Sequence, residues 1–111
     1  MQDLVNEMNH KRQELNAAIQ ILKERGIDKA KAENKYRMEL SKEILIQRDN
    51  KIPVTIISDI CRGKKEIAKL KLDRDIADIM YESVMQRIYA TKLELQILDN
   101  QIKAEWKGDG S

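Results

Sequence analysis

The chain has 111 residues, of which 36% are charged, 41% are hydrophobic and 4% are aromatic, and it contains no Phe. This composition favours helices, and it is typical of a helical bundle or coiled coil rather than of a sheet protein or a disordered chain. The net charge of +2 excludes no class of partner. No apolar run approaches about 20 residues and no signal-peptide segment is evident, so we expect no membrane span.

Residues 3–25 and 29–48 are predicted to form the first two helices, because apolar residues recur there at helical spacing. Gly26, between them, has two interpretations. It is either a left-handed residue that ends the first helix, with Ile27 contacting Leu22 in a Schellman turn, or a glycine inside one continuous helix. Asp49 to Lys51 and the following Pro53 should end the second helix.

Residues 54–62 are expected to form a short helix that ends at Gly63, and residues 64–106 a long one, because that stretch has neither Pro nor Gly. Roughly 43 residues at 1.5 Å per residue make a helix of about 64 Å. A compact chain of this size would have a radius of gyration of only about 13 Å. The sequence therefore predicts an all-α fold, an elongated antiparallel helical hairpin or coiled-coil-like bundle completed by oligomerisation. It would be a single domain over residues 1–107 with a polar tail at 108–111.

The long predicted helix carries two apolar faces. With Ile67 at heptad position a, nine of the twelve a and d residues up to position 105 are apolar, and the polar ones are Arg74, Thr91 and Glu105. A second stripe lies about 160° around the helix at positions c and f. Its large members are Leu72, Ile76, Ile79, Leu93 and Ile97. We interpret the first face as packing on residues 1–50, and the second as binding another subunit or a target. Scattered surface apolar residues are the alternative.

The residues that could carry chemistry are few. His10 has Glu7 and Glu14 on its helical face, which is half of a di-iron carboxylate motif, but the chain holds no second pair. A solvated face with ordinary charge pairs is the preferred interpretation, so we expect no metal and no cofactor. Cys61, the one cysteine, fits a reducing, cytoplasmic setting. It is either a small core residue or an exposed thiol activated by the basic residues beside it. No nucleophile, nucleotide or zinc motif is present, and we expect no enzymatic activity.

Residues 62–74 hold six basic and two acidic residues. The candidates for phosphate contacts are Arg62, Lys64, Lys65, Lys69 and Lys71. A solvated helix start is the alternative. The preceding segment resembles the recognition helix of the Cro/repressor-type helix-turn-helix family through Thr55, Ile56, Ser58, Ile60, Gly63 and Lys64. This resemblance implies DNA binding, but the segment has an extra residue before Ser58 and lacks the tight turn of that family.

Over residues 36–106 the chain is similar to a group of small uncharacterised helical proteins encoded by phages and prophages of Gram-positive bacteria. The stretches that carry this resemblance are YRMELSKEI, IPVTIISDICRG, LKLDRDIADIMY and LQILDNQIKAEW. The resemblance implies an accessory role in which the protein binds a host or phage macromolecule.

Two functions are therefore expected. The first is a non-enzymatic interaction protein, a homo-oligomer with a dimer as the first expectation, which binds a host or phage protein. The alternative is a nucleic-acid-binding accessory or regulator that uses the basic helical segment at residues 53–74.

Overall fold

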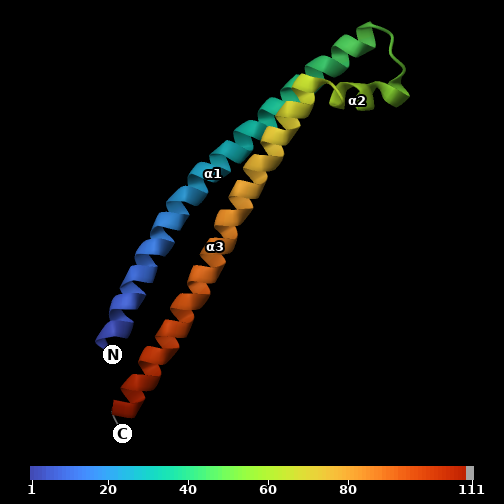
Figure 1. Ribbon diagram of the computed structural model, residues 1–111. Helices are drawn as coiled ribbons and strands as arrows, with labels where there is room; N and C mark the ends of the chain where they lie inside the picture. The colour runs from blue at the N-terminus through green and yellow to red at the C-terminus, as the bar shows by residue number, and fades with distance from the viewer. Residues whose placement is uncertain (110–111) are drawn as a thin grey trace. The chain divides into compact units, whose positions relative to one another are not determined.

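The computed structural model describes residues 1–109, which form three helices in the order α1 (Gln2–Asp49), α2 (Val54–Arg62) and α3 (Lys65–Asp109) (Figure 1). The described residues include no β-strand, and the expected all-α class is confirmed. The chain divides into two compact units. Unit 1 comprises residues 1–24 and the described part of residues 82–111, and unit 2 comprises Arg25–Tyr81.

α1 is one helix of 48 residues, so the two helices expected over 3–25 and 29–48 are continuous. Gly26 lies inside α1 and does not adopt a left-handed conformation. A Cβ atom at Gly26 would lie 3.5 Å from the Tyr81 ring, which is an ordinary contact distance. Gly26 thus sits against an aromatic side chain of α3 within unit 2, and no turn forms there.

The left-handed turn occurs instead at the true end of α1, where Lys51 has φ 62°. The Lys51 N–H donates to the Arg48 carbonyl at 2.9 Å, and the Ile52 N–H donates to the Gln47 carbonyl at 3.1 Å. This pair of bonds is a Schellman motif, in which two carbonyls of the last helical turn are satisfied. A lysine therefore occupies the position that most often belongs to glycine.

α2 coincides with the range expected from the sequence. Pro53 occupies its N-cap position, and the Pro53 carbonyl accepts hydrogen bonds from the Ile56 and Ile57 N–H groups at 3.1 Å. Ile57 and Cys61 are buried on the inner face of α2, and Cys61 is fully buried. Cys61 is thus a small core residue and not an exposed thiol.

α3 starts at Lys65 and continues to Asp109, three residues beyond the expected end at 106. Gly108 and Asp109 therefore belong to the helix rather than to the expected tail, and the rest of that tail lies outside the described residues.

Each unit pairs a stretch of α1 with a stretch of α3 in antiparallel order. In unit 1, Ala18 packs with Val84 and Ile88, and the N-terminal amine lies 3.0 Å from Glu105. In unit 2, the Lys29 amine contacts Asp78 at 2.9 Å, and Glu43, farther along α1, contacts Lys64, directly before α3. The antiparallel pairing expected for the helical hairpin is therefore present in both units.

The three polar residues in the first heptad face of α3 each have a partner. Arg74 reaches Glu33 on α1 at 3.5 Å. The Thr91 hydroxyl donates to the Arg87 carbonyl at 2.8 Å, and Glu105 binds the N-terminal amine. Because these partners satisfy them, the polar residues interrupt the apolar face without leaving an uncompensated polar group.

Candidate functional site

The second apolar stripe of α3 lies on the exposed side of the helix. In unit 2, Leu72, Ile76 and Ile79 are 57%, 48% and 66% exposed, and we call these three residues the unit 2 patch. In unit 1, Leu93 and Ile97 are 59% and 50% exposed, and we call them the unit 1 patch.

The opposite face of α3 is buried against its own chain. Ile67, Ile88 and Leu98 are only 5 to 6% exposed. The heptad face thus uses its apolar surface within the chain, whereas the two patches keep theirs in contact with solvent. Large aliphatic side chains recurring at heptad spacing on such a face are typical of a helix that binds another helix.

The five basic candidates do not form one free cluster. Lys64 pairs with Glu43, whose side chain is 16% exposed. The hydrogen bond from Lys64 lowers the pKa of Glu43, and the same bond raises the pKa of Lys64. Lys64 is therefore engaged in the fold of unit 2 and is a poor candidate for binding phosphate.

The other four basic candidates remain exposed, and they form no ion pair among the described residues. They are Arg62, Lys65, Lys69 and Lys71. Arg62 ends α2, and the other three lie in the first two turns of α3. These four side chains make up the exposed basic group of unit 2.

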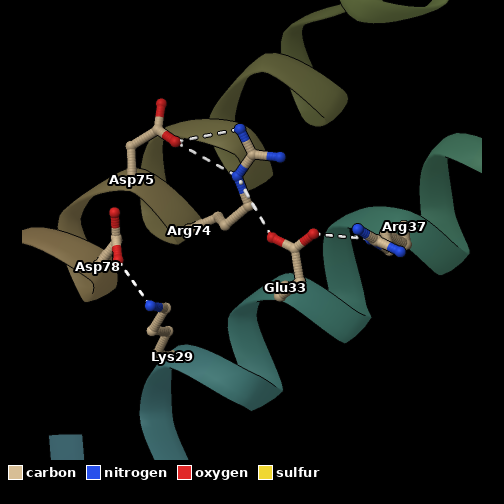
Figure 2. Close-up of polar contacts among 6 residues, drawn as sticks. All are labelled: Lys29, Glu33, Arg37, Arg74, Asp75 and Asp78. Carbon is tan, nitrogen blue, oxygen red and sulfur yellow. Dashed lines mark hydrogen bonds and ion pairs between the residues drawn. The ribbon is translucent and has the colours of Figure 1, made fainter. Parts of the chain in front are cut away.

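A polar network in unit 2, not anticipated from the sequence, links α1 to α3 (Figure 2). Arg37 Nε donates to a Glu33 oxygen at 2.6 Å, and the other Glu33 oxygen faces Arg74 Nε at 3.5 Å. Arg74 Nη2 also lies 3.1 Å from Asp75. Figure 2 shows a second link beside it, in which the Lys29 amine points to Asp78 at 2.9 Å.

Two aromatic rings support this network. Arg74 Cζ lies 4.6 Å from the centroid of the buried Tyr36 ring, and Lys29 Nζ lies 4.7 Å from that of Tyr81. Both distances are within the range of a cation–π interaction. The network lines a shallow groove, but its cations and carboxylates compensate each other. The arrangement therefore fixes the alignment of α1 and α3 in unit 2.

His10 is solvated, with its side chain 69% exposed, and its Nε2 atom lies 3.3 Å from Glu14. Glu14 also contacts Lys11 at 3.3 Å, so it belongs to an ordinary surface charge group. Among the described residues, no three His, Cys, Asp or Glu side chains are grouped in a way that could hold a metal ion. None of the described helices combines the length and apolarity required to cross a membrane.

Comparisons with protein-family models, curated proteins and solved structures find no match to this chain. Its function is therefore inferred from the surfaces described above.

Proposed function

We propose that this protein is a non-enzymatic helical interaction module, which binds a protein partner through the exposed patches of α3. The assembly that we expect first is a homodimer. One observation carries this proposal. Five large aliphatic side chains at heptad spacing are 48 to 66% exposed, while the opposite face of the same helix is buried.

The free energy available from these patches is appreciable. Fully burying a Leu or Ile side chain lowers the free energy of the protein by about 1.5–3 kcal/mol. Covering a half-exposed side chain in an interface therefore contributes roughly 1 kcal/mol to association. Five of them would supply on the order of 5 kcal/mol before flanking contacts are included. A closed two-fold dimer is the commonest assembly for a self-complementary face, and it would cover the patches of both copies.

The sequence stretches that resemble phage- and prophage-encoded proteins imply an accessory role, and we propose that role for this module. In that role the patches would bind a host or phage protein. The protein would either bind this partner as an intact dimer, or the partner would displace the second copy. A face that can pair with a helix of its own kind can also accept an amphipathic helix of a partner.

Sedimentation of full-length Leu93→Asp tests the proposal. The wild type should sediment at twice the chain mass of 13.0 kDa at micromolar concentration. Leu93→Asp should raise the dissociation constant by on the order of tenfold or more, because a charge replaces a side chain that assembly buries. Leu45→Asp is the matched control, since Leu45 is also 59% exposed but lies on α1. A monomeric wild type, or equal effects of the two variants, would contradict the proposal.

A second function is favoured by the exposed basic group of unit 2. Four exposed cations lie close together in sequence at the end of α2 and the start of α3, and within residues 1–109 they form no ion pair. We propose binding of nucleic-acid phosphates there as the alternative function. Support is weaker than for the patches, because the group contains no aromatic residue that could stack on a base.

A further inference from the structure

We propose that the second copy binds unit 1, with residues 83–106 of one chain packed antiparallel against the same residues of the other, and with Leu93 opposite Ile97. This inference rests on the proposed self-association, and it adds the contacting face and its orientation. It also narrows that proposal, because it leaves the unit 2 patch open to the proposed protein partner. Every residue of the contact belongs to α3 within unit 1.

The exposed face around the unit 1 patch carries no charge. At about 100° per residue, the residues of this segment within about 60° of Leu93 are all exposed and uncharged. They are Gln86, Tyr89, Ala90, Leu93, Gln96, Ile97, Asn100 and Ala104, and we call them the uncharged stripe. All charged residues of the segment lie outside it. In a chain with 36% charged residues, such a face is typical of a surface that a partner covers, because the centres of interfaces are depleted in charge.

The corresponding face of α3 in unit 2 differs in charge. Lys65, Lys69 and Asp73 lie within about 60° of Ile76, and all three are exposed. A second copy placed on this face would have to remove these charges from water, which is costly unless each one finds a partner. The uncharged stripe of unit 1 imposes no such cost, so it is the favoured place for a second copy.

The order of residue sizes along the uncharged stripe favours antiparallel pairing. The facing residues are Leu93 with Ile97, Ala90 with Asn100, and Gln86 with Ala104, and each pair occurs twice in a two-fold dimer. Each alanine thus faces a longer side chain, and large residues opposite small ones fill the space between helices. A parallel dimer would instead set Ala90 against Ala90 and Ala104 against Ala104, which leaves gaps between the larger pairs.

The charges at the two ends of the stripe fit the same arrangement. Glu82 and Lys107 are exposed, and neither forms an ion pair within residues 1–109. In this register, Glu82 of one copy is level with Lys107 of the other to within about 1.5 Å along the helix axis. A parallel dimer would also offer Glu82 a cation, Arg87, but it would set Lys107 against Lys107. Glu94 comes near Glu94 of the second copy in the antiparallel dimer, and Lys11 compensates it at 2.7 Å.

Disulfide cross-linking tests the orientation. Full-length Gln86→Cys and Ala104→Cys are prepared separately, one of them with an affinity tag, then mixed and oxidised. A disulfide requires the two Cβ atoms to approach within about 4.5 Å. In the antiparallel dimer Gln86 lies opposite Ala104 of the second copy, whereas identical positions are roughly 27 Å apart along the helix axis. The mixed product should therefore dominate over both self-disulfides.

Arg87→Cys and Lys103→Cys provide the matched control. Both positions are exposed and would be level with each other in the same register, but they lie on opposite flanks of the uncharged stripe. This pair should give little product, and the wild type, whose Cys61 is fully buried, should give none. If self-disulfides of Gln86→Cys and of Ala104→Cys dominate, the dimer is parallel, and the antiparallel inference fails while the proposed self-association stands.

Sedimentation of two matched variants tests the location. Ile97 and Ile76 are 50% and 48% exposed on the same helix, in unit 1 and unit 2 respectively. Ile97→Asp should raise the dissociation constant of the dimer by about tenfold or more, whereas Ile76→Asp should change it by less than about twofold. Equal or reversed effects in a protein whose wild type is dimeric would overturn this inference alone. A monomeric wild type would contradict the proposed self-association as well.

Discussion

Glu43 on α1 accepts hydrogen bonds at the same carboxylate oxygen from Lys64, directly before α3, and from Gln47, whose Nε2 atom lies at 2.8 Å. Gln47 is itself buried, at 8% exposed. This arrangement ties the C-terminal part of α1 to the start of α3 within unit 2. It also makes the stability of unit 2 depend on the protonation of one carboxyl group.

The pH dependence of unfolding should reveal this ion pair. The hydrogen bond from Lys64 holds the pKa of Glu43 below its ordinary value of 4.5. A carboxyl group whose pKa is lower in the folded state stabilises that state above its unfolded pKa, and the contribution is lost as pH falls through the folded value. Wild type should therefore be more stable than Glu43→Gln at pH 7, and the difference should shrink below about pH 4.5.

Denaturant unfolding of both proteins between pH 3 and pH 7 measures this difference. Glu39→Gln is the matched control, because Glu39 pairs with Lys42 three residues away on the same helix. A Glu43→Gln difference that is constant over this range would mean that the carboxylate charge does not matter to the fold.

Gly26→Ala should stabilise the protein. Gly26 has helical neighbours on both sides, and glycine inside a helix costs roughly 0.5–1 kcal/mol relative to alanine. The added methyl group would meet the Tyr81 ring at 3.5 Å, so it should fit without displacing the ring. Thermal unfolding should show a higher midpoint for Gly26→Ala and a lower one for Ala30→Gly in the same helix. A destabilised Gly26→Ala variant would indicate that helix α1 is interrupted at Gly26.

Ile88→Asp should unfold unit 1. Ile88 is 5% exposed and packs with Ala18 and Val84, and an unpaired buried charge there costs at least about 3 kcal/mol. Circular dichroism should show a large loss of helicity for Ile88→Asp, whereas the exposed Leu93→Asp should keep its helicity. Equal unfolding of the two variants would mean that the buried and exposed faces of α3 do not have separate roles.

The nucleic-acid alternative predicts a salt-dependent affinity for duplex DNA. If the exposed basic group binds phosphates, Lys65→Glu/Lys69→Glu should reduce the log–log slope of affinity against salt by about 0.9 for each phosphate that the variant no longer neutralises. Lys23→Glu/Lys92→Glu makes the same change in net charge at exposed sites of unit 1. Lys64 is left unchanged because Glu43 already binds it. Wild type that binds neither duplex nor single-stranded nucleic acid at 50 mM salt would rule this function out.

The division of α3 into a buried and an exposed apolar face was predictable, because it depends only on helical periodicity. Ile67, Ile88 and Leu98 are buried, and Leu72 and Leu93 are exposed, as the heptad assignment indicates. The end of α2 at Gly63 was predictable for a similar reason, since the signal is local.

What the sequence left open depends on contacts between distant residues. Gly26 was ambiguous because its neighbour Tyr81 lies on another helix. The partners of Arg74 and Lys64 were missed because Glu33 and Glu43 can be matched to them only once the antiparallel register is known. The end of α1 close to residue 48 was predicted, but the left-handed conformation of Lys51 was not, because a lysine gives no signal for a left-handed residue.

The contact of Arg74 with Glu33 also bears on how unit 2 folds. Two helices that pair through a seven-residue repeat have slipped alignments, displaced by about 10 Å, which keep much of the apolar contact. A slip of one repeat toward the N-terminus of α1 would move Arg74 from Glu33 to the neighbourhood of Lys29, where it would meet a like charge. The slipped pairing is thereby destabilised relative to the native one. We therefore expect Arg74 to disfavour kinetic trapping in a misaligned hairpin, and we expect Arg74→Leu to tolerate the slipped pairing better than the wild type.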